Sequence, residues 1–522
     1  MIEPQDWQAQ LARVVGGDGL VVEAGRIAAF ATDVYRAQAM PAAVVRPGSV
    51  EELQSAIRIL AQHRLAYTVR GGGASYTDGY NSTDPAHLLI DLGRLDRIVE
   101  IDEYGGFITV EAGVTWAQMS DALAAKGFRT PFRGPFSGLA ATVAGSMSQN
   151  AISHGSGAYG ISAESALSFD VVLADGTLLR TGSAAAGLKP FARHFGPDLT
   201  GLFTGDCGAY GIKARVTLPI IRNRPAHRVV SFAFAEFAQM HESMRRIAIE
   251  RIEDSHFSLD AALSQGQIAR QDRAGNTIGM ALSILRSSPS LAAGLKQVAA
   301  AGALARRQIG RSAFMTHYIV EGFDDAEAKA RLHRVRQLNE GLGREIAATV
   351  PAVVRGMPFA PLYNTLGPGG ERWVPLHGVF AHADVVPFHQ ALQHFYFERA
   401  SEMKHHRVWG GGMYSTVGTS GFLYEIALYW PDEQTPYHRE HVPADYLAQL
   451  PTFPANPEAR EYVHRLKGEL IELYDRHGAV HFQLGRAYPY AARLDEPAVR
   501  LAQAIKGALD PHMLGAPGLL GL

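Results

Sequence analysis

Residues 66–80 read AYTVRGGGASYTDGY. The run 66–69 is β-prone, and the glycines after Arg70 predict a strand that ends in a turn too tight for bulky side chains. Such a turn can direct several backbone N–H groups at one point and form an anion-binding nest, here suited to a pyrophosphate. An ordinary glycine turn would fit the same run. The candidate binding residues are Arg70, Gly71, Gly72, Gly73, Ala74, Ser75 and Thr77.

The composition favours a small-molecule ligand. The 522 residues include 49 basic and 51 acidic ones, with a formal charge of −2 and no long block of like charge, so we expect no nucleic-acid partner. The single cysteine, Cys207, excludes an intrachain disulfide framework and a cysteine-based zinc site. There is no signal-type N-terminus and no apolar run of about 18 residues. We expect a soluble, cytoplasmic homodimer without a membrane span.

The elements around the glycine loop predict a compact α+β unit. Residues 1–40 read as a short helical lead-in. Ser49 and Glu52 make a capping box that opens a helix, and a second capped helix begins at Thr115. The opening order is therefore strand, helix, strand, glycine loop. Strands are expected over residues 41–46, 66–69, 88–92 and 107–111, with a β-hairpin over 167–181.

A second segment, residues 134–160, consists mostly of small residues. A helix that packs only on protein normally carries leucines, whereas small side chains let the backbone approach a large, flat group. The segment therefore predicts one wall of a site for a bulky planar ligand; close packing of helices through Ala and Gly is the alternative. The candidate wall residues are Ser137, Gly138, Thr142, Gly145, Ser148 and Gly155.

A third glycine-rich loop, residues 197–213, leads through Ile212 into a strand that ends at Leu218. A domain boundary is expected near residues 219–225, because the pattern then changes to a second alternation of strands and helices. The expected later elements are strands at 229–234, 277–285, 314–320, 373–380, 413–417 and 423–430, and helices at 324–342, 458–477 and 496–509.

Together, the run Arg70-Gly71-Gly72-Gly73, the segment 137–148 and the run from Asp198 to Ile212 resemble the FAD domain of the vanillyl-alcohol oxidase and p-cresol methylhydroxylase superfamily. The resemblance covers residues 41–222. Residues 504–518 resemble the C-terminal element with which these enzymes return to that domain.

This resemblance implies an α+β fold with a two-part, PCMH-type FAD-binding domain, residues 41–222 and 471–522, and an α+β substrate cap over 223–470. It also implies FAD with its pyrophosphate on the backbone of residues 71–75. The isoalloxazine ring would lie at the domain interface, against residues 137–148 and the C-terminal loop that contains Arg486.

The chain departs from the family at the position where many members tether FAD. They carry a histidine directly after the glycines, and this chain has Ala74, which has no nucleophilic nitrogen. We therefore predict non-covalent FAD. The cap-domain histidine of the phenol-oxidising branch has no counterpart near residues 422–424, although His405 and His406 leave a second route open.

Candidate catalytic residues come from the C-terminal loop and from isolated titratable groups. Arg486 and Tyr488 lie in a loop that resembles the anion-binding loop of the phenol oxidases, where an arginine stabilises a phenolate or the charge on reduced flavin. The aspartate that phenol-oxidising relatives use has no clear counterpart, and Glu164 is near its place. His154 or His481 could act as base instead.

Metal ligation is not expected. His438 with His441, and His477 with His481, have helical spacing, but neither pair has a carboxylate in a recognised metal motif.

The leading prediction is an FAD-dependent oxidase or dehydrogenase that oxidises an aromatic, para-substituted phenolic substrate by hydride transfer from a benzylic carbon to the flavin. One alternative is a 2-hydroxy-acid dehydrogenase in which Arg486 pairs with a carboxylate. Another is a non-catalytic flavoprotein subunit. Dioxygen, a cytochrome or a quinone could each reoxidise the flavin.

Overall fold

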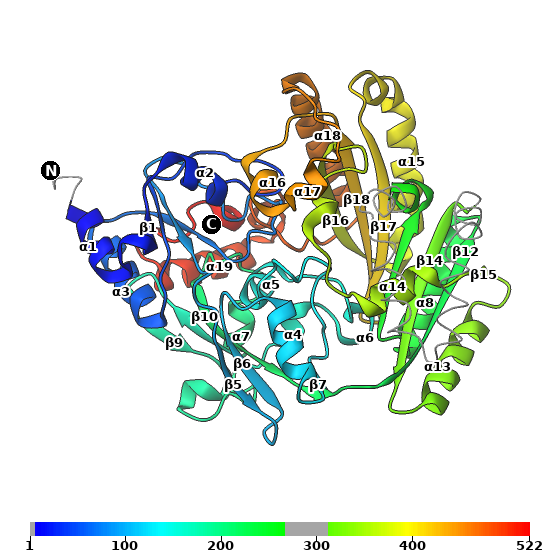
Figure 1. Ribbon diagram of the computed structural model, residues 1–522, viewed down its shortest axis with the longest axis horizontal. Coiled ribbons are helices and arrows are strands. Elements are labelled where there is room, and N and C mark those ends of the chain that lie inside the picture. The colour runs from blue at the N-terminus through cyan, green and yellow to red at the C-terminus, as the bar shows by residue number, and fades with distance from the viewer. Residues whose placement is uncertain (1–5, 267–311) are drawn as a thin grey trace.

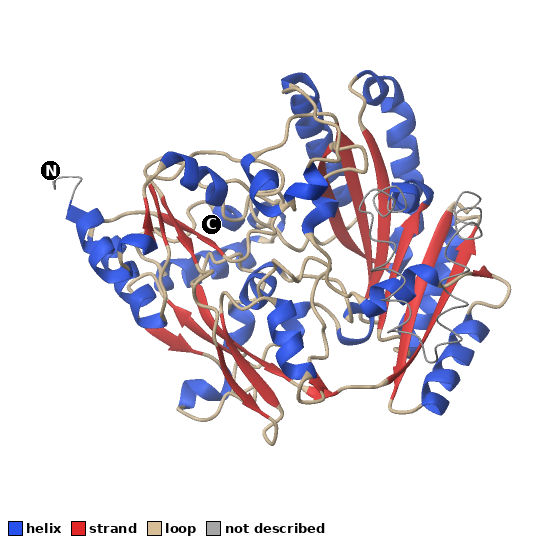
Figure 2. Ribbon diagram, viewed as in Figure 1, coloured by secondary structure: helices blue, strands red, loops and turns tan. Residues whose placement is uncertain are grey.

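The structure is a computed structural model that describes residues 6–266 and 312–522. It has two lobes, with both ends of the described chain in the first lobe (Figure 1). Helices and strands are mixed in both, which confirms the predicted α+β class (Figure 2). The strand predicted at 277–285 lies outside the described residues. No helix in the described ranges combines the length and apolarity that a membrane crossing needs.

The first sheet of the first lobe has four strands in the order β1-β2-β4-β3. β4 pairs in parallel with both β2 and β3, so β3 is an edge strand that runs directly into the glycine loop. Ser49 caps α3 as predicted, because its side chain accepts a hydrogen bond from the N–H of Glu52. The elements are α1 (Asp6–Val15), β1 (Leu20–Val21), α2 (Ala24–Ala31), β2 (Ala43–Val45), α3 (Val50–Gln62), β3 (Tyr67–Arg70) and β4 (Leu88–Asp91).

The second sheet of this lobe has five strands in the order β5-β6-β10-β8-β9, all antiparallel. Thr115 forms the predicted capping box with Gln118 at the start of α4. The predicted hairpin is confirmed as β8 and β9. The elements are β5 (Ile98–Asp102), β6 (Phe107–Glu111), α4 (Trp116–Ala124), β7 (Phe128–Arg129), α5 (Val143–Gln149), α6 (Ser156–Tyr159), β8 (Ser168–Val172), β9 (Leu178–Arg180), α7 (Leu199–Leu202), β10 (Ile212–Pro219) and β11 (Ile221–Arg222).

The second lobe is built on a seven-stranded sheet in the order β15-β12-β14-β13-β17-β18-β16. Its outer face packs on long helices through an apolar core (Figure 1). The strands are β12 (Ala226–Phe234), β13 (Ser255–Asp260), β14 (Phe314–Gly322), β15 (Arg344–Ile346), β16 (Arg372–Ala381), β17 (Trp409–Val417) and β18 (Gly421–Trp430). The described helices are α8 (Phe237–Glu250), α13 (Asp325–Leu338), α14 (Thr349–Gly356), η4 (Leu362–Thr365), α15 (His382–His405), α16 (Pro436–His441), α17 (Ala444–Leu447) and α18 (Pro457–Arg476).

The C-terminal segment returns to the first lobe, where α19 (Glu496–Leu509) lies (Figure 1). Beyond α19 the chain runs beside the open edge of β3. The N–H of Tyr67 donates to the carbonyl of Leu514 at 2.9 Å, and the N–H of Ala516 donates to the carbonyl of Tyr67 at 2.7 Å. The last residues therefore complete the sheet that carries the glycine loop.

Candidate active site

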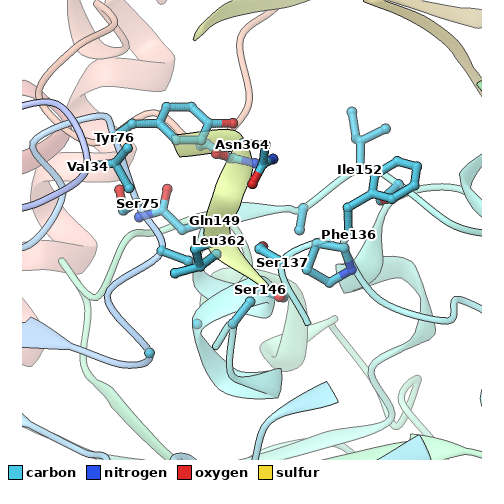
Figure 3. Close-up of a pocket in the computed structure, with 18 of the residues that line it drawn as sticks. Val34, Ser75, Tyr76, Phe136, Ser137, Ser146, Gln149, Ile152, Leu362 and Asn364 are labelled. Carbon is cyan, nitrogen blue, oxygen red and sulfur yellow. The ribbon is translucent and has the colours of Figure 1, made fainter. Parts of the chain in front are cut away.

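A cavity of about 530 Å³ lies between the two lobes. The first lobe contributes residues from each of the three loops singled out in the sequence, and the second contributes the inner face of its sheet together with α14 and η4. Figure 3 shows part of this lining, with Ser75 and Tyr76 from the glycine loop and Ser137 and Ser146 from the small-residue segment. The three loops thus converge on one site.

The glycine loop lines this cavity with unpaired backbone donors. Residues 71–75 all face it. Within the described chain, their N–H groups donate to no acceptor. Gly73 has φ +71°, a conformation that side chains with a Cβ rarely adopt. Because backbone N–H groups that face a protein interior normally have acceptors, this row of free donors marks a place for an anionic group.

Arg70 and Thr77 were predicted to contact the cofactor. Both lie outside the cavity lining, on the far side of the glycine loop. The Arg70 guanidinium donates to Asp91 at 2.6 Å and lies against the ring of Phe30. The Thr77 carbonyl accepts from the N–H of Arg486 at 2.9 Å. Both residues brace the loop from behind.

The small-residue wall is largely where the sequence placed it. Ser137, Thr142, Gly145 and Ser148 line the cavity. Gly138 does not, because its Cα faces the ring of Phe359, which a Cβ would meet at 2.4 Å. Gly155 also lies away from the cavity, where it begins α6 with φ +95°. From the third loop, Ile212 lines the cavity together with Cys207, Gly208, Gly211 and Lys213.

Arg486 and Tyr488 lie outside the cavity lining, contrary to their predicted catalytic role. The Arg486 guanidinium donates to three backbone carbonyls, those of Asp78 and Asn81 at 3.0 Å and that of Pro517 at 2.9 Å. Tyr488 is buried under the cap sheet and its hydroxyl accepts from the N–H of His377 at 3.0 Å. These contacts join the C-terminal segment to the glycine loop and to the cap.

The other predicted acids and bases are also outside the cavity lining. His481 lies between the carbonyl of His377 and the carboxylate of Asp475, at 2.8 Å from each. His154 lies 3.0 Å from the Ser255 hydroxyl, and burial lowers its pKa to about 4. Glu164 is exposed on the surface. The structure therefore brings none of these three side chains to the cavity.

The polar groups that do face the cavity from the second lobe come from its sheet. Alternate residues of β18 line the cavity, and Glu425 is the one carboxylate among them. Tyr76 enters from the glycine loop and packs edge-on against Trp373 of β16, with ring centroids 5.5 Å apart. Burial raises the pKa of Glu425 to about 8 and raises that of Tyr76 well above its ordinary value. The alternating β18 residues are Leu423, Glu425, Ala427 and Tyr429.

Comparison with known proteins agrees with this geometry. Residues 41–182 match the family model described as FAD binding domain. The flavoprotein subunit of 4-cresol dehydrogenase [hydroxylating] from Pseudomonas putida is 23% identical over 98% of this chain and 94% of its own. The protein is an FAD-dependent oxidoreductase whose fold is that of p-cresol methylhydroxylase.

One further sequence relative and two solved structures are also similar to this oxidoreductase. Glycolate oxidase subunit GlcD of Bacillus subtilis (strain 168) is 30% identical over 42% of this chain, a match that spans less than half (45%) of that protein. The crystal structure of p-cresol methylhydroxylase with substrate bound superposes with a TM-score of 0.73 at 18% identity, over 99% of this chain and 96% of that one. The 4-ethylphenol oxidase from Gulosibacter chungangensis gives a TM-score of 0.71 at 15% identity over the same shares of the two chains.

The oxidoreductase fits FAD in two respects. The free N–H groups of residues 71–75 suit the pyrophosphate, because such donors stabilise phosphate oxygens. The small side chains of the second and third loops leave a surface on which a flat ring system can lie. Ala74 lines the same cavity and offers no nucleophile.

The remaining histidine candidates lie elsewhere. His405 is exposed at the end of α15, and His406 stacks on Tyr462 with centroids 4.5 Å apart. His438 and His441 are both in α16, where the Nε2 atom of His441 lies 3.1 Å from the Arg70 guanidinium. Across residues 6–266 and 312–522, no group of three or more His, Cys, Asp or Glu side chains is arranged to hold a metal ion.

Proposed function

We propose that the oxidoreductase oxidises a neutral aromatic substrate, a para-substituted phenol, by hydride transfer from the benzylic carbon to non-covalent FAD. The observation that supports this best is the chemistry of the cavity wall. Much of the wall is aromatic, which favours a flat, uncharged ring. The rings that line it belong to Tyr76, Phe136, Phe257, Trp373, Tyr414, Tyr429 and Tyr437, among others.

The cavity lining argues against an anionic substrate. It contains no arginine among the described residues. Lys213 is the one lysine there, and its amine already pairs with the Asp206 carboxylate at 2.5 Å with both side chains buried. A 2-hydroxy acid would bring a carboxylate into this space without a free cation to neutralise it, and burying an unpaired charge is costly. The phenolic proposal has no such cost.

FAD, when bound, supplies the two-electron acceptor for the reaction. The residues of this chain hold and orient the reactants. The N–H groups of residues 71–75 bind the pyrophosphate, and the aromatic wall holds the substrate ring and keeps water away from it. In this proposal the residue that binds the substrate oxygen is Tyr76, and not Arg486 as the sequence had suggested. Because the pKa of Tyr76 is raised well above its ordinary value, its hydroxyl remains a hydrogen-bond donor for the substrate oxygen.

Anaerobic mixing tests the proposal. A panel of para-substituted phenols and a panel of 2-hydroxy acids are each added to the oxidised holoenzyme, and the visible flavin absorbance is followed. Only a true substrate bleaches it. Bleaching by a phenol supports the proposal, whereas bleaching by hydroxy acids alone would replace it with the 2-hydroxy-acid reaction, and bleaching by neither would favour a non-catalytic subunit. Reoxidation of the bleached enzyme by dioxygen, a cytochrome or a quinone then identifies the electron acceptor.

Non-covalent attachment is tested separately. Acid precipitation of the holoenzyme should leave all flavin in the supernatant, and mass spectrometry of the denatured chain should give the mass of the unmodified polypeptide. A flavin adduct on the chain would contradict this part of the proposal, since Ala74 cannot form one and another side chain would have to be responsible.

A further inference from the structure

Glu425 stands out among the residues of the cavity. It lies in the middle of β18, a strand whose other residues are apolar or aromatic apart from Tyr hydroxyls and the indole N–H. Its side chain faces the cavity. In the ladder it lies opposite His377 of β16 on one side and Met413 of β17 on the other. Glutamate is rarely buried without a partner, so its place in this strand calls for a reason.

The groups that face Glu425 do not neutralise it. Tyr76 and Tyr488 come from the first lobe and the C-terminal segment, Tyr474 comes from α18, and each has a pKa raised mainly by burial and further by Glu425. His377 has its pKa lowered well below the ordinary value, so it is uncharged at neutral pH. Across the described ranges, no hydrogen bond or ion pair links the Glu425 carboxyl to another residue.

We propose that Glu425 is the catalytic base that accepts the hydroxyl proton of the substrate during the oxidation. The inference rests on the proposed function. An unpartnered carboxyl that faces an interior cavity costs folding free energy, and such groups are retained where a ligand supplies the missing partner. Here the partner is the hydroxyl of the bound phenol. The aromatic wall brings the ring into the same space, so the hydroxyl and the carboxylate can meet.

The step balances as follows. The benzylic C–H bond breaks and its electron pair leaves with the hydrogen as hydride, which reduces the flavin by two electrons. The substrate O–H bond breaks at the same time, its proton goes to a carboxylate oxygen of Glu425, and the electrons of that bond form the new C=O bond through the ring. The substrate loses two electrons and two hydrogens. The carboxyl proton later returns to solvent.

The base must be ionised to act, and this sets the pH dependence. Since burial raises the pKa of Glu425 to about 8, half of the carboxyl groups are ionised near pH 8, and the carboxylate fraction rises through that pH and levels off well above it. The facing tyrosines and His377 remain uncharged through this range. The free phenol ionises only near pH 10. The rate of flavin reduction should therefore rise with pH along a limb with an apparent pKa near 8.

Single-turnover flavin reduction by the best phenol, measured anaerobically from pH 6 to pH 9.5, tests the proposal. Glu425→Gln should lose the limb and slow reduction on the order of 100-fold, since general-base catalysis contributes at least that much. Glu425→Asp should retain the limb at a lower rate. A matched control is Glu253→Gln: burial raises the pKa of Glu253 to about 8 as well, but this residue does not line the cavity, so the limb should remain.

A second measurement does not depend on turnover. Infrared difference spectra of the holoenzyme between pH 6.5 and pH 9.5 should show loss of a protonated-carboxyl band in the wild type and in the exposed Glu461→Gln, and a smaller loss in Glu425→Gln, where Glu253 still contributes. Suppose that a phenol bleaches the wild type, and that Glu425→Gln binds FAD and keeps both the rate of flavin reduction and its pH limb. This result would overturn the inference about Glu425 and leave the proposed function in place. A wild type that no phenol bleaches would overturn the proposed function, and the inference with it.

Discussion

A Cβ added to Gly72 would lie 1.8 Å from the carbonyl oxygen of Ala140. The glycine loop and the small-residue segment are therefore in backbone contact, and this contact leaves no room for a side chain. The two segments, which both line the cavity, hold each other in place.

Gly72→Ala should consequently disrupt cofactor binding. The backbone must shift to relieve the overlap, and the N–H groups of residues 71–75 then lose their common direction. We expect protein purified without added FAD to carry at most about one-tenth of the wild-type flavin, as measured by the ratio of visible to ultraviolet absorbance after gel filtration. Gly468→Ala on α18 is the control, because nothing lies within 4 Å of its Cβ position, and full flavin content is expected there.

Arg486→Met should lower stability and FAD affinity without a selective loss of phenol binding. The guanidinium donates to three carbonyls that join the glycine loop to the C-terminal segment, and its removal should cost about 3 kcal/mol. Thermal unfolding and FAD titration measure these two effects. With saturating FAD, the dissociation constant of the phenol should be unchanged; a large increase would restore Arg486 to the substrate-binding role that the sequence suggested.

Tyr76→Phe should weaken phenol binding by about tenfold, or ~1.4 kcal/mol, because the variant keeps the ring against Trp373 and removes only the hydroxyl. Perturbation of the flavin spectrum by a non-oxidisable phenol reports the dissociation constant. Tyr462→Phe provides the comparison, since its hydroxyl is buried on α18 away from the cavity and has no hydrogen-bond partner among residues 6–266 and 312–522. Equal binding by the two variants would remove Tyr76 from the site.

Glu425→Gln should become more stable than the wild type as the pH rises. The pKa of Glu425 is raised by burial from 4.5 to about 8 in the folded chain, so the folded state holds a proton that the unfolded state has released between those values. Wild-type stability should fall relative to the variant by about 1.4 kcal/mol per pH unit in this window at most, and level off above it. Melting temperatures from pH 5 to pH 9 measure the difference.

The exposed Glu461→Gln provides the reference for that series, because it removes a carboxyl of the same type from the surface of α18. Its melting temperature should follow that of the wild type at every pH. A difference between Glu425→Gln and the wild type that does not change with pH would show that Glu425 titrates in the folded state as it does when unfolded.

The features of the FAD half that could be predicted were local ones. Caps at Ser49 and Thr115 depend on residues three positions away, and the glycine loop is encoded by consecutive residues, so each can be read from a short stretch. The wall at residues 137–148 was found from side-chain size alone. These signals need no knowledge of the chain elsewhere.

The catalytic side could not be predicted in the same way. Arg486 finds its acceptors at Asp78 and Asn81, more than 400 residues earlier in the chain, and nothing in its own loop indicates this. Apart from Glu425, both faces of β18 carry mostly apolar or aromatic residues, so the hydrophobic period does not show which face lines the cavity. A signal was present nevertheless: Glu425 is the one charged residue in that strand, and a carboxylate in a largely buried strand is a candidate for a functional role.

Because Tyr67 pairs with Leu514 and Ala516, the flavin site forms only when the C-terminal segment is present and folded. The site is assembled from segments that precede and follow the cap, so a chain cut or left unfinished near residue 510 would present the glycine loop on an unsupported edge. Yellow colour in a preparation should then mean that the C-terminal segment has paired with the strand that carries the glycine loop. Flavin content can serve as a simple assay of intact, correctly assembled protein before any substrate is known.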